Sequence, residues 1–192
     1  EYVDFYKQLT FDFNEPLAHI HLVSDMPVNV RSILFVPSKR ERNLMSPNSD
    51  HGLRLYSRKV LIQERNRDLL PEYLRFVDGV VDSEDLPLNV SREMLQEHKS
   101  LAAIRRQLTR KTLKLLAELA EEDADKYAKL WNEFGSVIKE GLHTDGGQRK
   151  ELTELLRYRS TADEDGGLTS LKAYLDAMGE DQKYIWYIAG PN

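Results

Sequence analysis

The chain has 192 residues and a mass of 22.3 kDa, and 41% of its residues are hydrophobic while 31% are charged. This composition is typical of a globular chain with one domain or slightly more, and it excludes intrinsic disorder and a fibrous fold. The sequence contains no cysteine, which excludes a disulfide framework, a thiol nucleophile and a zinc site with thiolate ligands.

The net charge of −5 is unevenly distributed along the chain. Residues 91–120 hold 7 basic and 3 acidic residues, so the middle of the chain is its basic part. The N-terminus begins at Glu1 without a Met, a basic segment or an apolar segment, which indicates a piece of a longer protein rather than a signal peptide. The longest apolar stretch is too short to span a membrane.

The first third of the chain predicts one helix followed by strands. Aromatic and leucine side chains recur at helical spacing over residues 2–9, which predicts a short helix that ends near Thr10. Side chains alternate over 17–23, and 28–36 is rich in β-branched residues. These two runs predict strands joined by a hairpin turn.

A long polar segment follows these strands. Residues 37–52 are rich in charged and turn-forming residues and carry two apolar side chains, Leu44 and Met45. Loops of this length are usually functional or disordered, so we expect a mobile loop, above all at residues 40–50. A strand at 53–62, a short helix at 70–76 and a strand at 77–81 complete a group of about four strands with helices between them.

The second half of the chain has a helical pattern from Ser91 onward. Two apolar stripes predict two long helices, and Gly135 and Gly141 should weaken or end the second of them. A third helix is expected around 152–156, and a fourth around 171–178 with Thr169 or Ser170 as its N-cap and Gly179 as its C-cap. The apolar run 184–189 predicts a last strand.

Most motifs of known chemistry are missing. The chain has no Gly-rich phosphate loop, no dinucleotide fingerprint, no nucleophile elbow and no paired-histidine zinc motif. His19 and His21 share one face of a strand, but two ligands do not make a metal site, and a solvated or packed pair is the favoured interpretation. We therefore predict no metal site.

A basic helix face offers a second hypothesis. Phosphates or an acidic partner could contact it, although a solvated face is the favoured interpretation. The residues of this face are Arg105, Arg106, Arg110, Lys111 and Lys114. The acidic runs 121–123 and 163–165 border helices and are interpreted as loops or capping segments without chemistry.

The segment 82–96 concentrates most of the functional signal. A strand ends in an acidic turn, an apolar loop follows, and Ser91 is placed to cap a helix, whose N-terminus attracts anions. Arg92 adds a planar charge suited to phosphate oxygens, and Gln96 lies on the same helix face. The segment therefore predicts a phosphate-contacting element.

Three apolar residues in the same segment suggest a docking surface. Leu86, Leu88 and Val90 are unusually apolar for a loop, and Asn89 lies among them. The alternative is structural, because Arg92 could instead pair with Glu84 or Asp85 while the leucines are buried. Spacing alone favours this alternative.

The run V-V-D-S-E-D-L-P-L-N-x-S-R-E-x-L-Q at residues 80–96 resembles the middle segment of the heat-shock protein 90 chaperone family. The resemblance covers nearly the whole chain and outweighs the structural alternative for the loop. It extends to EYVDFYK at 1–7, LYSRKVLI at 55–62, PEYLRF at 71–76, LLRY at 155–158 and LTSL at 168–171. Residues 55–63 are more similar to the mitochondrial and some bacterial branches than to the eukaryotic cytosolic one.

The resemblance implies an α/β fold, a three-layer α-β-α sandwich with a small sheet. The large subdomain would span 1–120 and carry the catalytic loop, while 121–192 would form a helical connector and the start of a smaller αβ subdomain. In the family, the arginine matching Arg92 reaches the terminal phosphate of ATP, and the glutamine matching Gln96 assists. ATP and its Mg²⁺ are held mainly by a separate N-terminal domain, so we expect this segment alone to hydrolyse nothing.

The resemblance also implies partners and a location. The implied partners are the N-terminal ATP-binding domain of the same chain, client proteins, co-chaperones, and a second copy joined through a C-terminal domain. Neither nucleic acid nor a membrane is implied. The bacterial cytoplasm is the expected location, with the mitochondrial matrix as the alternative.

Two departures from the family affect the expected client contacts. The loop at 40–45 reads R-E-R-N-L-M where the family usually has an aromatic F-D-x-F element, and Phe13 stands where a tryptophan is common. The residues expected to contact clients or partners are therefore Phe13, Leu44 and Met45. From a different functional class, the alternative is a free-standing interaction module that binds acidic partners or nucleic acid through the basic helix at 105–114.

Overall fold

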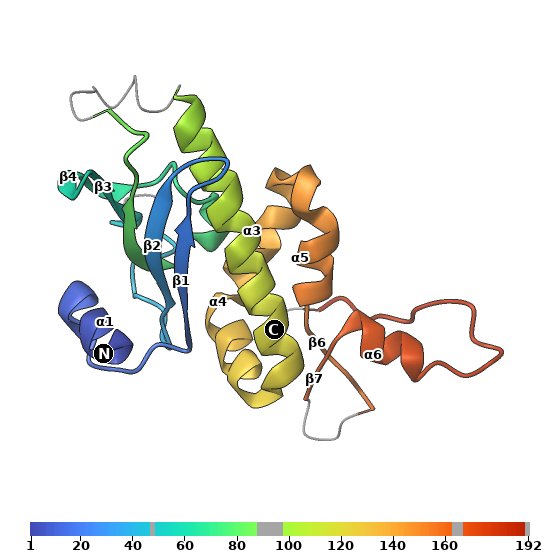
Figure 1. The fold of residues 1–192 in the computed structure, drawn as a ribbon. Helices are drawn as coiled ribbons and strands as arrows, with labels where there is room; N and C mark the ends of the chain where they lie inside the picture. Colours follow the sequence, from blue (N-terminus) through green and yellow to red (C-terminus); the bar gives the residue numbers. More distant parts are fainter. Residues whose placement is uncertain (47–48, 88–97, 163–166, 191–192) are drawn as a thin grey trace.

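The computed structural model describes residues 1–46, 49–87, 98–162 and 167–190. A five-stranded sheet has a short helix on one face and two long helices on the other (Figure 1). This arrangement confirms the expected α/β fold with three layers, helix, sheet and helix.

The N-terminal elements follow the sequence pattern within two residues. Helix α1 ends at Phe11, a left-handed residue with φ of 58°, and an antiparallel hairpin follows it. The elements are α1 (Tyr2–Thr10), β1 (Ala18–Ser24) and β2 (Val30–Val36).

The strand expected over residues 53–62 is wrong, because the chain folds there into a second hairpin. Its strands are β3 (Leu53–Ser57) and β4 (Val60–Asn66). Arg58 and Lys59 form the two-residue turn with φ values of 49° and 66°. Tight hairpin turns of this length need positive φ and usually contain Gly or Asn, so the Arg-Lys turn gave no signal in the sequence.

Strand β5 (Asp78–Asp82) follows the short 3-10 helix η1 (Glu72–Leu74) and completes the sheet. The strand order is β1-β2-β5-β3-β4, with β5 antiparallel to β2 and parallel to β3. Gly79 has a φ of 153°, and a Cβ there would collide with the carbonyl oxygen of Ile33 on β2. Glycine therefore permits the close approach of the two strands at the centre of the sheet.

Alternate residues of β2 face the two helical layers. Val30, Leu34 and Val36 belong to the main core, which the long helices cover. Phe35 packs instead against α1, where it joins Tyr6 and Leu9 in a smaller cluster. Both faces of the strand are thus buried, as expected for the middle layer of a sandwich.

Three helices form the second layer and its continuation. They are α3 (Lys99–Glu122), α4 (Ala124–Thr144) and α5 (Arg149–Leu155), and a 3-10 turn η2 (Gly146–Gln148) joins the last two. Asp123 caps α4 by accepting a hydrogen bond from the backbone N–H of Lys126 at 2.9 Å. The acidic run that ends at Asp123 thus includes a cap, as its position beside a helix predicts.

The expectation that glycines weaken or end the second long helix is wrong. Helix α4 continues through Gly135 and Gly141 as far as Thr144. A Cβ at Gly141 would lie 2.8 Å from the Tyr73 ring and from Leu152, so this glycine lets η1 and α5 pack closely against α4. Packing, rather than helix propensity, explains its presence.

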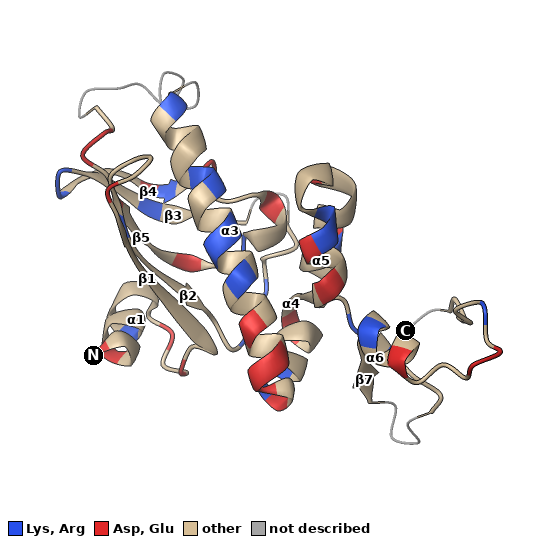
Figure 2. Cartoon of the chain, turned by 45° about the vertical axis from the view of Figure 1, so that its right-hand side comes forward, with Lys and Arg blue, Asp and Glu red and all other residues tan. Residues whose placement is uncertain are grey.

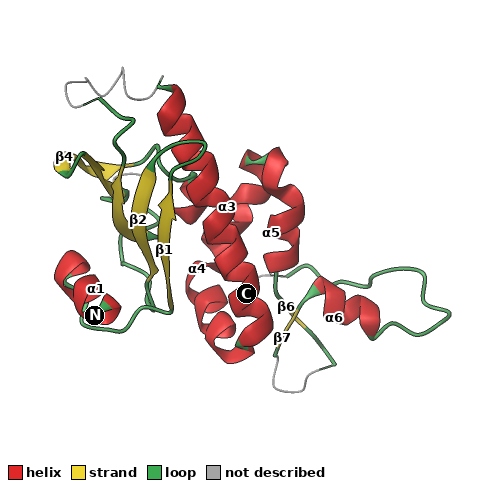
Figure 3. Ribbon diagram, in the orientation of Figure 1, coloured by secondary structure: helices red, strands yellow, loops and turns green. Residues whose placement is uncertain are grey.

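The C-terminal part holds a two-stranded sheet and a short helix, namely β6 (Tyr158–Arg159), β7 (Leu168–Thr169) and α6 (Leu171–Asp176). Ser170 caps α6, as one of the two predicted N-caps, but the helix ends at Ala177 rather than at Gly179. The strand predicted at 184–189 is wrong: this run is irregular and exposed (Figure 3), because no described strand pairs with it. Within the described ranges, no helix combines the length and apolar character that a bilayer crossing needs.

We expect Gly141→Ala to destabilise the fold. Alanine improves helix propensity by about 1 kcal/mol, but its methyl group would overlap the fully buried Tyr73 ring, and such overpacking costs about 1–3 kcal/mol. Urea denaturation should show a net loss of stability. Gly146→Ala is the matched control because a Cβ there meets nothing within 4 Å, and equal stability of the two variants would contradict the packing role.

Candidate functional site

The candidate site begins where β5 leaves the sheet, at residues 82–86, which we call the loop base. Ser83 is fully buried, and its N–H donates to the carbonyl of Tyr56 on β3 at 3.2 Å. Its hydroxyl donates to the carbonyl of Asn29, in the β1–β2 connection directly before β2, at 2.5 Å. The residue therefore connects the end of β5 to the strands on both sides.

Three further residues of the loop base are held by groups outside it. The carboxylate of Asp85 accepts a hydrogen bond from the N–H of Asn29 at 2.7 Å. The carbonyl of Leu86 accepts one from the Ser57 hydroxyl at 2.5 Å, in a buried environment. The carboxylate of Asp82 accepts a bond from the Lys59 N–H at 3.2 Å. The chain is thus fixed immediately before the segment expected to carry the phosphate contact.

Most residues expected at the site lie outside the described residues. These are Leu88, Asn89, Val90, Arg92 and Gln96. Leu86 is described, and with 2% exposure its side chain belongs to the main core. The expectation that Leu86 contributes to an exposed apolar docking surface is therefore wrong, because core packing already buries it.

The three residues expected to contact clients differ in accessibility. Phe13 is 83% exposed and Met45 is 49% exposed, so both can be reached from solvent. Leu44 is only 5% exposed and packs into the main core, which corrects its placement on an exposed loop surface. The loop is consequently anchored at its middle rather than free throughout.

Arg75 also holds the 37–52 loop in place. Its guanidinium pairs with Glu140 on α4 through contacts of 2.6 and 2.8 Å, and it also donates to the carbonyl of Leu44 at 3.3 Å. The hydrogen bonds with Glu140 raise the pKa of Arg75 although burial opposes this. The pair joins η1, the loop and α4 into one packed unit.

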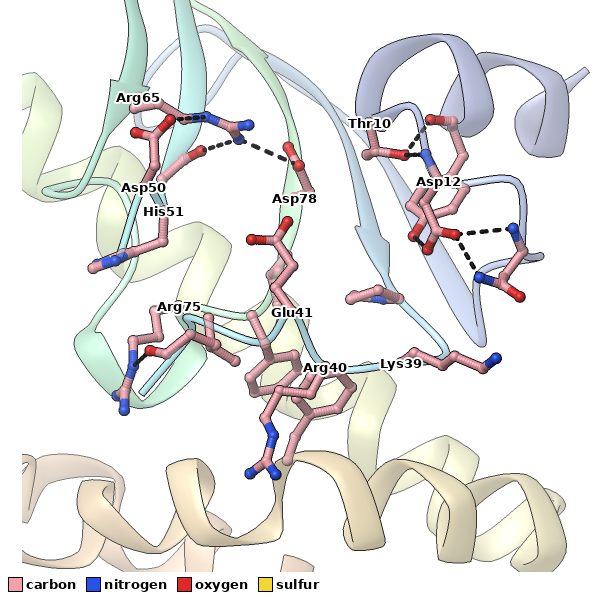
Figure 4. A pocket seen from close by; sticks show the side chains of 18 residues that line it. Thr10, Asp12, Lys39, Arg40, Glu41, Asp50, His51, Arg65, Arg75 and Asp78 are labelled. Atoms are coloured by element: carbon pink, nitrogen blue, oxygen red, sulfur yellow. Dashed lines mark hydrogen bonds and ion pairs between the residues drawn. The ribbon is translucent and has the colours of Figure 1, made fainter. Parts of the chain in front are cut away.

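A cavity of about 190 Å³, lined by charged and apolar side chains, lies between the end of α1, the 37–52 loop and the start of β5 (Figure 4). Arg65 occupies its upper wall, 3.3 Å from Asp78 and 4.0 Å from Asp50. The carboxylate of Glu41 points toward Asp78, whereas the charged ends of Lys39 and Arg40 point away from the centre (Figure 4). Cavities for drug-sized ligands hold roughly 300–1,000 Å³, so this one is small, and we assign no ligand to it.

On the opposite side of this cavity, Tyr6, Asp12 and Asn14 form a hydrogen-bond network. The Tyr6 hydroxyl donates to Asp12 at 2.7 Å, and burial together with this bond raises the pKa of Tyr6. Burial would raise the pKa of Asp12, but hydrogen bonds from Asn14 and Tyr6 outweigh it and lower that pKa. The network holds the connection between α1 and β1 in place.

The basic helix face is confirmed as exposed and lies along α3 (Figure 2). Arg105 donates to the carbonyl of Asp68 at 3.2 Å, and Lys114 pairs with Glu118 at 3.2 Å. Surface contacts of this kind contribute little, so the arrangement fits a solvated face.

The two strand histidines are exposed to solvent, and both contact Tyr2. The Tyr2 ring stacks on His19 with centroids 4.2 Å apart, and its hydroxyl lies 2.8 Å from Nδ1 of His21. Among the residues that the structure describes, no three His, Asp or Glu side chains come together as a metal site would require. The exposure of both histidines and their contacts with Tyr2 agree with the expected solvated or packed pair.

Sequence reasoning missed the contacts that hold the loop base. Asn29 contributes backbone groups, whose partners depend on strand register and not on residue type. Ser57 gave a weak signal, because it is a small polar residue at a position of β3 that alternation assigns to the core. A buried serine must satisfy its hydroxyl, and this one does so on the loop.

Comparison with known proteins gives a consistent result along the whole chain. A family model described as "Hsp90 protein" matches residues 1–192. The chain is 44% identical over 190 residues to the "Chaperone protein HtpG" of Geobacter sulfurreducens, covering 99% of this chain and 29% of that protein. It is 47% identical over 192 residues to the protein of the same name from Nitratidesulfovibrio vulgaris, covering 100% and 30%. The chain thus spans less than a third of the length of these relatives.

We expect Leu44→Ala to release the loop from the core. Removing a buried leucine side chain costs about 2–4 kcal/mol, and limited proteolysis should then cut within residues 40–50 faster than in the parent. Met45→Ala, at the exposed neighbouring position, should change stability by less than about 1 kcal/mol. Equal cleavage rates for the parent and Leu44→Ala would show that Leu44 does not anchor the loop.

Proposed function

Because this chain belongs to the Hsp90 family, we propose that it is the middle part of an ATP-dependent molecular chaperone. The observation that carries the proposal is the match of the entire chain to about 30% of the length of proteins named as chaperones. A segment of that size can supply one part of a divided site and leaves the rest to other domains.

The proposed contribution of this segment is a contact to the terminal phosphate of ATP through Arg92. A guanidinium presents a planar set of donors and keeps its charge, so it suits phosphate oxygens better than an ammonium does. Gln96, four residues later, would add a neutral hydrogen bond. The fixed loop base at 82–86 supports this proposal, because a phosphate contact needs a defined starting point for the chain that carries it.

ATP and Mg²⁺ themselves would be bound mainly by an N-terminal domain. The described residues do not fit a nucleotide: the cavity of about 190 Å³ is small, and its Arg65 is already occupied by Asp50 and Asp78. The sequence also lacks a Gly-rich phosphate loop. We therefore derive no catalytic step from this segment other than the arginine contact.

Client proteins, co-chaperones and a second copy of the chain are the proposed partners. Phe13 and Met45 are exposed apolar residues and are the proposed client contacts, while dimerisation would use a C-terminal domain. The relatives described above are bacterial, which favours the bacterial cytoplasm over the mitochondrial matrix.

A second function is favoured by the exposed cations on α3. A free-standing module could bind acidic partners or nucleic acid through Arg106, Arg110 and Lys111, for which no described acidic side chain supplies an ion pair. Phosphate contacts would give an affinity that falls steeply with salt, so a salt titration with DNA separates this function from the chaperone role.

We expect Arg92→Ala to lower the ATPase rate of the full-length protein by at least about tenfold, which is roughly 1.4 kcal/mol of activation free energy. The lost guanidinium would stabilise charge that shifts during phosphoryl transfer. Gln96→Ala should have a smaller effect because a neutral hydrogen bond to phosphate is weaker. Steady-state ATPase and thermal melting of the same variants provide the measurement. An Arg92→Ala rate within twofold of the parent would remove Arg92 from catalysis, and a collapsed melt would assign it a structural role.

We also expect the isolated 192-residue chain to bind ATP with a Kd above about 1 mM, equivalent to less than about 4 kcal/mol of binding free energy. One arginine cannot replace the hydration of a triphosphate. Isothermal titration calorimetry with Mg²⁺ and ATP tests this expectation. Submillimolar affinity would contradict a site divided between two domains.

A further inference from the structure

The guanidinium of Arg75 has an acceptor for each of its five N–H groups. Nη1 donates to the carbonyl of Glu72 at 2.9 Å and to the carboxylate of Glu140 at 2.6 Å. Nη2 donates to the second oxygen of Glu140 at 2.8 Å and to the sulfur of Met45 at 3.6 Å. Nε donates to the carbonyl of Leu44 at 3.3 Å. A guanidinium has no donors beyond these five, so every N–H of Arg75 has one partner.

The sulfur of Met45 is the weakest acceptor in this set. The other four acceptors are carbonyl or carboxylate oxygens, whereas a thioether sulfur accepts hydrogen bonds poorly. A charged donor forms a stronger bond when its acceptor is a good one. The side chain of Arg75 is only 10% exposed, so solvent does little to replace the missing strength of this one contact.

Met45 is also accessible to an oxidant, because it is 49% exposed. The chain contains four methionines and no cysteine, so a peroxide finds only methionine sulfur to oxidise among its sulfur atoms. Oxidation adds an oxygen to the sulfur and makes an apolar side chain polar. At Met45 the sulfur already contacts Nη2 of Arg75, and the unbranched side chain has three rotatable bonds with which to orient the new oxygen.

Met26 provides an internal comparison. It is 80% exposed and lies in the connection between β1 and β2. Its carbonyl accepts a bond from Ser24, but its sulfur makes no hydrogen bond to any group in the described part of the chain. A sulfoxide oxygen on Met26 would therefore be hydrated by solvent. Both methionines are exposed, and the contact with a buried cation distinguishes Met45.

We propose that Met45 is a methionine-oxidation site at which the sulfoxide oxygen binds Arg75 and holds residues 40–46 more firmly. With hydrogen peroxide as the oxidant, a lone pair of the sulfur attacks one peroxide oxygen, the S–O bond forms and the O–O bond breaks. The departing hydroxide takes up the proton of the transferred oxygen and leaves as water. The sulfur is oxidised by two electrons and the peroxide is reduced by two, so the step needs no further reactant.

The expected consequence is a smaller population of the open segment. Replacing the thioether by a sulfoxide oxygen as the partner of a charged donor should lower that population about three- to tenfold. Proteolysis follows the open population when opening and closing are faster than cleavage. Arg40 and Arg42 are exposed and lie within the segment, so trypsin reports on it directly.

The experiment treats the full-length protein with hydrogen peroxide and measures limited tryptic cleavage after Arg40 and Arg42 under native conditions. Peptide mass spectrometry should find sulfoxide at Met45, and cleavage should slow about three- to tenfold. Treatment with the two methionine sulfoxide reductases, one for each sulfoxide epimer, should restore the parental rate. Met45→Leu cannot form a sulfoxide, so its cleavage rate should not change with peroxide, which also controls for damage elsewhere in the protein.

A variant that carries an oxygen without peroxide tests the contact with Arg75 itself. Met45→Gln places an amide oxygen near the position of the sulfoxide oxygen and should be cleaved at least about twofold more slowly than Met45→Leu. Met26→Gln is the matched control, because it makes the same change at an exposed methionine without a cation beside it. It should leave cleavage at both arginines at the parental rate.

Three results would overturn the inference. Unoxidised Met45 in protein whose Met26 is fully oxidised would exclude position 45 as an oxidation site. Unchanged or faster cleavage once Met45 carries the oxygen would show that the sulfoxide does not bind Arg75. A peroxide effect of equal size in Met45→Leu would assign the effect to another residue.

Discussion

Burial of both faces of the sheet is the constraint on which the other features depend. Strand β2 places Leu34 toward the long helices and Phe35 toward α1, so neither helical layer can be removed without exposing apolar surface. Strand β5 lies next to β2 at the centre, with Gly79 allowing the two backbones to approach. The loop base is fixed in position because it directly follows this central strand.

The long helices also hold the neighbouring loops in place. Arg75 connects η1, the 37–52 loop and α4, and Tyr73 of η1 packs on Gly141 of α4 while its hydroxyl donates to Asp145. The loop is held by the long polar side chain of Arg75, and η1 packs on α4 where Gly141 has no side chain. The loop consequently combines a buried anchor, Leu44, with an exposed neighbour, Met45.

The spacing of apolar residues and the helix-capping residues predicted much of this fold from the sequence. Residues 2–9 repeat at helical spacing and 17–23 alternate, and the observed α1 and β1 agree closely with both patterns. The β3–β4 turn escaped prediction because Arg58 and Lys59 adopt positive φ without the residue types that usually mark it. The run at 184–189 has strand composition, but a strand also requires a neighbour, which composition does not supply. For the site, the residue pattern of 82–96 and the family resemblance together predict a phosphate contact, which stays a prediction. The bonds to Asn29 depend on strand register and could not be predicted from the sequence.

The central position of β5 also determines how the segment responds to motion. Its backbone is hydrogen-bonded on one side to β2 and on the other to β3, so its amide protons can exchange with solvent only when the sheet itself opens. A stiff strand does not absorb a displacement by local bending. Movement imposed on the loop base at 82–86 therefore acts on β5 and, through its hydrogen bonds, on β2 and β3 together.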